Sequence, residues 1–167
     1  MRLALQDLCF MHPKLRGHPT DLSKFGALAL QRAGHASPVE ARIDHDGPGD
    51  TAEIEWLPQD LAVLDVLDRN RVTEHGAEAI ALAYINTMGG WVVKRCMKRG
   101  ESADWLLLNE TRVLALEVSG TAEGNPLPRL TEKRQQVGRC TLSDDYPSDF
   151  LAVVVSFSEP SILADRP

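Results

Sequence analysis

The sequence predicts a single α/β domain built on a mixed β-sheet, and three observations support this class. From Thr73 to Phe157 the hydrophobic patterns follow the order helix, strand, strand, strand, helix, strand. The stretch Asp149–Phe157 is apolar almost throughout, which is typical of a strand buried on both faces inside a sheet. Residues 39–56 alternate around a polar turn, which indicates an antiparallel hairpin. A chain of 167 residues is long enough to bury one core of its own.

The N-terminal part is predicted to form a helix and this hairpin. Thr20-Asp21 precedes a helical pattern over about Leu22–Arg32. Neither the helix nor a lone hairpin can bury much apolar surface by itself. We therefore expect residues 1–72 to pack as an α/β extension on a core formed by residues 73–167.

Three further helices are expected along the chain. Residues 58–70 (PQDLAVLDVLDRN) carry leucines at helical spacing, which predicts a helix with an apolar core face. Thr73 is a suitable N-cap for a helix over Glu74–Met88, which the following two glycines end. After a loop rich in glycine and proline, a polar helix is predicted over about Glu132–Cys140. The tail from residue 158 onward is expected to be loosely attached.

Three short strands are predicted between these last two helices. They cover Trp91–Lys98, Asp104–Leu108 and Arg112–Ser119, each rich in Val, Leu or Trp and bounded by turn residues. Successive strands joined by short turns form an antiparallel meander. The rest of the chain is expected to be organised around this meander.

The meander brings two acidic residues together. If residues 110 and 111 form a two-residue hairpin loop, the pairing of the strands places Asp104 directly opposite Glu117. Ser119 lies two positions further along and projects to the same face. Two neighbouring carboxylates repel each other unless a cation lies between them. A hard cation with oxygen ligands is the natural partner, so the pair predicts a metal site.

Composition excludes several classes of protein. The three cysteines, Cys9, Cys96 and Cys140, form no CxxC pair, so neither a disulfide framework nor a zinc site is indicated. A reducing, cytoplasmic setting is expected. The first ten residues are interrupted by Gln6 and Asp7, unlike the apolar region of a signal peptide. No apolar run approaches the length that crosses a membrane, so no membrane association is expected.

The net charge of −6 is unevenly distributed. Residues 91–140 hold nine Lys or Arg and six Asp or Glu, whereas the rest of the chain holds nine and eighteen, out of totals of 18 and 24. Positive charge therefore gathers around the predicted carboxylate pair, where it can steer a polyanion. An ordinary solvated surface is the alternative explanation. The predicted nucleic-acid contacts are Lys94, Arg95, Lys98, Arg99 and Arg134.

The order of elements and the acidic motif resemble the PD-(D/E)XK, or restriction-endonuclease-like, nuclease superfamily. In that family an Asp begins the second core strand and an acidic-X-Lys triplet lies on the third. Here Asp104 heads the second strand, residues 117–119 (Glu-Val-Ser) occupy the triplet position, and Glu78 matches a helix glutamate of many members. The resemblance covers about half of the chain. It implies an αβββαβ core with a mixed sheet flanked by helices, carrying the N-terminal α/β extension.

The resemblance also implies a chemistry and exposes one departure. Mg²⁺, or Mn²⁺ in its place, would be bound by Asp104 and Glu117 with Glu78 as a third ligand, and would activate water for phosphodiester hydrolysis. The family's lysine is replaced by Ser119, which can donate a hydrogen bond but carries no charge. Some members of the superfamily move the lysine to a neighbouring element. The candidates here are Lys133 on the second core helix and the two strand lysines, Lys94 and Lys98.

Three hypotheses follow. The first is a Mg²⁺-dependent endonuclease or exonuclease, or a related DNA-processing protein of a defence, repair or mobile-element system, with DNA favoured over RNA. The second is a catalytically silent domain of the same fold that binds or assembles other proteins in a complex. The third discards the resemblance and regards the acidic pair as fortuitous, each carboxylate satisfied by a nearby arginine.

Overall fold

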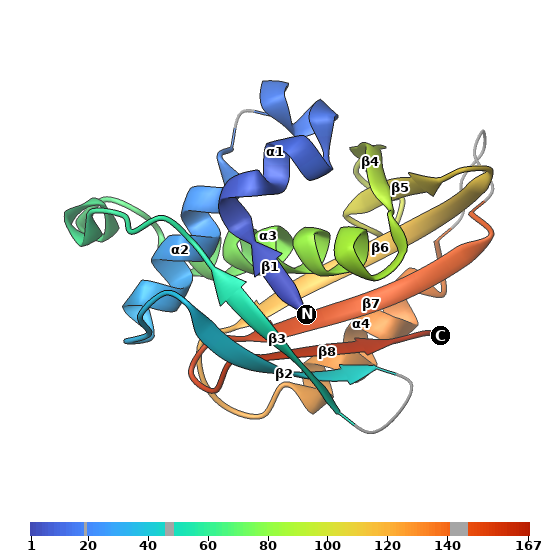
Figure 1. The fold of residues 1–167 in the computed structure, drawn as a ribbon. Helices are drawn as coiled ribbons and strands as arrows, with labels where there is room; N and C mark the ends of the chain where they lie inside the picture. Colours follow the sequence, from blue (N-terminus) through green and yellow to red (C-terminus); the bar gives the residue numbers. More distant parts are fainter. Residues whose placement is uncertain (19, 46–48, 141–146) are drawn as a thin grey trace.

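The computed structural model describes residues 1–18, 20–45, 49–140 and 147–167. In these ranges eight strands form one mixed sheet with helices on both faces (Figure 1). No helix in the described ranges is long and apolar enough to cross a membrane. The helices are α1 (Leu8–Met11), α2 (Leu22–Arg32), α3 (Arg69–Gly89) and α4 (Leu127–Val137). The strands are β1 (Arg2–Ala4), β2 (Val39–His45), β3 (Asp50–Glu55), β4 (Val92–Cys96), β5 (Trp105–Asn109), β6 (Arg112–Thr121), β7 (Asp149–Ser156) and β8 (Ser161–Asp165).

The strand order in the sheet is β1-β3-β2-β8-β7-β6-β5-β4. The predicted meander β4-β5-β6 is antiparallel, and β7 joins β6 in parallel after the crossover through α4. The predicted order of helix, three strands, helix and strand is therefore confirmed. The N-terminal strands continue the same sheet, because β2 pairs in parallel with β8 and antiparallel with β3.

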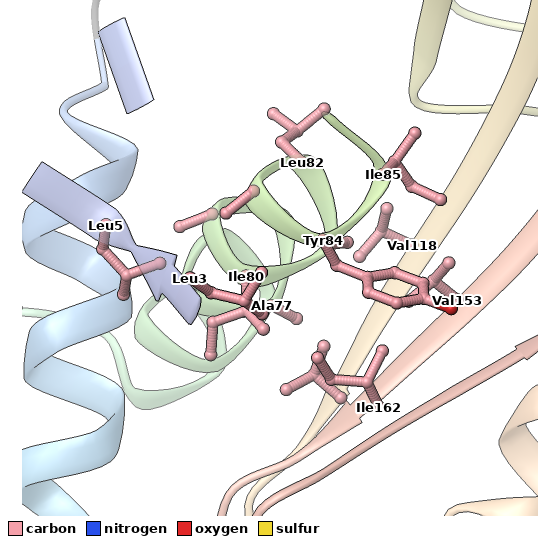
Figure 2. Packing of buried hydrophobic residues seen from close by; sticks show 14 of the residues in the cluster. Leu3, Leu5, Ala77, Ile80, Leu82, Tyr84, Ile85, Val118, Val153 and Ile162 are labelled. Carbon is pink, nitrogen blue, oxygen red and sulfur yellow. The ribbon is translucent and has the colours of Figure 1, made fainter. Parts of the chain in front are cut away.

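Helix α3 lies across one face of the sheet and contributes many of the buried core residues. Tyr84 is fully buried, and Figure 2 shows it against Val118, Val153 and Ile162 of three neighbouring strands. Helix α2 packs on α3 at close range. A Cβ at Gly76 would lie 2.8 Å from the Cβ of Ala29, so only glycine allows this approach. Helix α4 covers the opposite face (Figure 1).

The prediction of a helix over residues 58–70 is wrong. Only a 3-10 helix over Leu61–Asp65 forms there, and the following residues lead into α3. Aspartates account for the difference: Asp60 accepts a backbone N–H of the 3-10 turn, and Asp68 caps α3. Because α3 begins at Arg69, the boundary predicted between residues 72 and 73 falls inside this helix.

Two further predictions need correction. The tail is not loosely attached, because β8 lies between β7 and β2 with Ile162 and Leu163 buried on opposite faces. The sequence pattern did not predict this strand because it is only five residues long and follows directly after the turn that ends β7. Helix α4 begins at Leu127 rather than near residue 132 and ends at Val137. Pro126 is its N-cap and Pro128 lies in its first turn, where a missing backbone N–H costs nothing.

Candidate functional site

The hairpin register predicted from the sequence is confirmed. Asn109 pairs with Arg112 across the two-residue turn, and Trp105 pairs with Leu116 at the other end of β5. One residue further along, Asp104 therefore lies opposite Glu117. The acidic pair stands at the point where β5 begins and β6 continues past it.

Two carboxylates accept hydrogen bonds from backbone N–H groups of β6, in the part of the strand that extends beyond β5. Strand β6 runs on to Thr121, so its N–H groups on the β5 side have no strand partner there among the described residues. Asp104 Oδ2 accepts the Val118 N–H at 2.8 Å, and Glu74 Oε2 of α3 accepts the Gly120 N–H at 3.1 Å. Each carboxylate thus satisfies a backbone donor that would otherwise be left at a strand edge.

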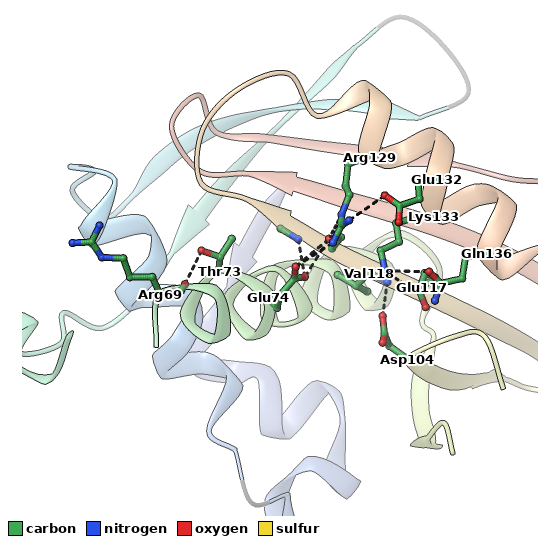
Figure 3. A network of polar contacts seen from close by, with 12 residues as sticks. Arg69, Thr73, Glu74, Asp104, Glu117, Val118, Arg129, Glu132, Lys133 and Gln136 are labelled. Atoms are coloured by element: carbon green, nitrogen blue, oxygen red, sulfur yellow. Dashed lines mark hydrogen bonds and ion pairs between the residues drawn. The ribbon is translucent and has the colours of Figure 1, made fainter. Parts of the chain in front are cut away.

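Glu117 is buried and paired with a lysine of α4. Its side chain is 1% exposed, and its Oε1 lies 2.5 Å from the Nζ of Lys133 (Figure 3). The same ammonium donates to Gln136 Oε1 at 3.3 Å. The other oxygen, Oε2, is buried and accepts no hydrogen bond from an N–H or hydroxyl group of the described residues. A protonated Asp104 is the neighbour placed to donate to Glu117.

Burial and like charge disturb the titration of this pair. Burial raises the pKa of Asp104 to about 7, and the charges of Glu117 and, more weakly, Glu78 act in the same direction. Burial also raises the pKa of Glu117, although the ammonium of Lys133 opposes that shift. The two carboxyl groups and one lysine therefore hold an extra proton near neutral pH. A second cation at this point would release it.

A second cluster lies beside the pair, around the buried Ser119. Its hydroxyl donates to the carboxylate of Glu74 at 3.2 Å and accepts from the Nε of Arg129 at 2.9 Å. The Arg129 guanidinium also lies 3.5 Å from Glu74 and donates to Glu132 at 3.0 Å. Figure 3 shows Arg129 and Lys133, one turn apart on α4, reaching the sheet side by side. Ser119 thus anchors an arginine instead of carrying a charge itself.

The third predicted metal ligand, Glu78, is near enough for its charge to raise the pKa of Asp104, but it makes no direct contact with the pair among the described residues. It pairs with His75 at 3.4 Å on α3, and within the described residues no three His, Cys, Asp or Glu side chains are grouped to hold a metal. Asp104 and Glu117 are the two carboxylates that remain. Mg²⁺ is commonly bound through one or two carboxylates and keeps several waters, so the pair fits this ion without a third protein ligand. The buried Oε2 of Glu117, which lacks an N–H or hydroxyl donor, supports that fit.

The predicted nucleic-acid contacts do not form one free surface. Arg95 pairs with Glu101 at 2.7 Å, and Arg134 pairs with Asp165 at 2.6 Å. Lys94 lies on β4, where its backbone carbonyl accepts a hydrogen bond from the ammonium group of Lys14. Lys98 and Arg99 are exposed at the turn between β4 and β5.

Sequence reasoning missed Glu74 and Arg129. Each lies four residues before a predicted site residue on the same helix, Glu74 before Glu78 and Arg129 before Lys133. Residues at this spacing share a helix face, and this signal was available.

Comparisons of the chain with protein-family models, with curated proteins and with solved structures found no match. The inference of function therefore starts from the geometry of the site.

Proposed function

We propose that this protein is a Mg²⁺-dependent nuclease of the restriction-endonuclease-like type that acts on DNA. The observation that carries the proposal is the arrangement of three side chains: Asp104 opposite Glu117, with the ammonium of Lys133 at 2.5 Å from Glu117. The order α3, β4, β5, β6, α4, β7, with β6 and β7 parallel, supports it, because the PD-(D/E)XK core has the same order.

In this proposal the carboxylates and the lysine have separate roles. Asp104 and Glu117 would hold Mg²⁺, or Mn²⁺ in its place. When bound, the ion polarises the scissile phosphate and lowers the pKa of the attacking water. With Glu117 engaged as a ligand, Lys133 would turn its ammonium to the negative charge that develops on the phosphate. Lys133 thus supplies from α4 the charge that Ser119 lacks.

Arg129 would add a second cation at the same place. Its side chain is 38% exposed, although the Nε is fixed on the buried Ser119. A guanidinium held at one nitrogen keeps donors in a fixed plane, which suits the oxygens of a phosphate. Glu74 and Glu132 hold it until a phosphate competes for it.

A catalytically silent binding module is the second candidate, and one observation favours it. Lys133 already pairs with Glu117, so this carboxylate has a cation partner without a metal ion. In that case the fold would serve assembly with a protein partner, and the acidic pair would only satisfy the edge of β6.

Measurements of metal binding and of DNA cleavage distinguish the nuclease from the binding module. We expect Mg²⁺ or Mn²⁺ to raise the melting temperature of the protein, since a ligand that binds only the folded state stabilises it. Glu117→Gln should abolish this shift and any cleavage of single- or double-stranded DNA. Glu110→Gln, which removes a carboxylate from the exposed hairpin turn, is the matched control and should change neither.

A variant of the lysine completes the experiment. Lys133→Arg keeps a positive charge and should retain part of the cleavage, whereas Lys133→Met should lose cleavage and keep the metal-dependent shift. If the parent protein shows neither a metal-dependent shift nor cleavage, the nuclease proposal fails and the binding module takes its place.

A further inference from the structure

A second positively charged feature lies away from the acidic pair, in a pocket between α2, the first turn of α3 and the loop after β6. The pocket has a volume of about 430 Å³. Arg32 and Arg69 line it together with Thr73 and Phe157. Glu123 is the one acidic residue among the lining residues of the described structure.

The guanidinium of Arg32 is fixed by neutral acceptors. Its Nη2 donates to Thr73 Oγ1 at 2.6 Å, and its Nη1 donates to the carbonyl of Arg69 at 3.2 Å. The Thr73 hydroxyl in turn donates to the same carbonyl at 3.0 Å. The planar group is therefore held in one orientation before any ligand arrives.

Neither arginine has a carboxylate partner among the described residues. The ion pairs of the structure engage neither Arg32 nor Arg69. Burial lowers the pKa of Arg32, and the nearby charge of Arg69 acts in the same direction. Two like charges at the wall of one pocket repel each other, and an anion between them removes that repulsion.

We propose that this pocket binds a phosphate group. Two guanidinium forks can each donate to phosphate oxygens, which gives both charge and directional hydrogen bonds. The source is either a backbone phosphate of DNA or a free phosphate compound. Glu74, which adjoins the acidic site, directly follows the pocket residue Thr73 on α3, so a DNA strand could engage both places (Figure 3). The inference goes beyond the proposed nuclease activity and does not require it.

Binding measured in EDTA tests the pocket separately from any metal-dependent chemistry. The probes are inorganic pyrophosphate, by calorimetric titration, and a fluorescein-labelled single-stranded 12-mer of DNA, by anisotropy. Arg69→Gln should weaken binding of one or both probes by about tenfold, because a directional charged contact is lost. Arg71→Gln is the matched control: Arg71 is exposed on the same turn, does not line the pocket, and loses the same charge.

The pattern of loss identifies the source. Loss with DNA alone points to a backbone phosphate, and loss with pyrophosphate alone points to a free phosphate compound. Glu123→Gln should tighten binding of the same probe, because a repelling carboxylate is removed from the pocket wall. The proposal is overturned if neither probe binds the parent protein, or if Arg69→Gln and Arg71→Gln weaken binding equally. Since Arg69 is exposed, its variant should melt at the parent's temperature.

Discussion

Two carboxylates perform the same backbone task at the edge of β6, yet their surroundings differ. Glu74 accepts the Gly120 N–H, is 41% exposed, and has the guanidinium of Arg129 beside it. Asp104 accepts the Val118 N–H, but it is mostly buried and lies opposite a second carboxylate. Burial and that neighbour raise the pKa of Asp104 to about 7.

The difference separates structure from function. Glu74 shows that a strand edge can be satisfied by a carboxylate that stays in contact with water and a cation. The repulsion at Asp104 is therefore not required by the fold. Groups with strongly shifted pKa values and an identifiable charge partner concentrate at functional sites. The pair of Asp104 and Glu117 is therefore the part of this edge on which the proposed cation site depends, and its repulsion costs stability.

The largest effect on stability is expected from removing the charge of Lys133. Lys133→Met keeps the apolar stem but leaves Glu117 buried without its partner, which should lower the free energy of unfolding by about 3 kcal/mol at pH 8. At pH 5 the loss should be smaller, because Glu117 can take up a proton. Urea unfolding at both pH values measures it, with Lys133→Arg as the control. An equal loss at the two pH values would indicate that packing, not charge, is what Met disturbs.

The substitution Asp104→Asn is expected to raise the free energy of unfolding. The pKa of Asp104 is about 7 in the folded protein against an ordinary 3.8, so between these pH values the folded state binds a proton that the unfolded state has released. The contribution of Asp104 to the stability of the parent should therefore fall as pH rises from about 4 to 7 and change little above. Asp104→Asn removes this dependence and can still accept the Val118 N–H.

The measurement is urea unfolding in EDTA at pH 5 and pH 8. The advantage of Asp104→Asn over the parent should be about 2 kcal/mol larger at pH 8, less than the full linkage energy because Asp104 keeps some contact with water. Parallel pH profiles for the parent and the variant would contradict the raised pKa.

The sequence predicted the acidic pair because its geometry is local. A two-residue turn fixes the register of β5 and β6, so Asp104 and Glu117 could be placed opposite each other from spacing alone. Lys133 was a candidate only through the resemblance, which implies that the missing lysine can lie on the second core helix. The structure has that helix, α4, as the crossover between the parallel strands β6 and β7.

The choice between Glu74 and Glu78 could not be made in the same way. Both lie on one side of α3, and which of them meets the end of β6 depends on how far α3 is shifted along the sheet. Gly120 sets that shift, because a Cβ there would lie 2.5 Å from the carbonyl of Thr73. This contact joins residues 47 positions apart and has no signature in either segment. The same holds for β8, because its position between β7 and β2 depends on contacts with strands that are far apart in the sequence.

The smallest effect is expected at Glu74, and it completes the comparison. Glu74→Gln removes a charge from an ion pair that is 41% and 38% exposed, where water screens the attraction. The amide oxygen can still accept the Gly120 N–H. The free energy of unfolding should therefore fall by less than about 1 kcal/mol. The decrease in stability with rising pH should persist in this variant, since Asp104 is unchanged. If Glu74→Gln instead removed the pH dependence, the two carboxylates would form one coupled group, and the separation of a structural from a functional carboxylate would be wrong.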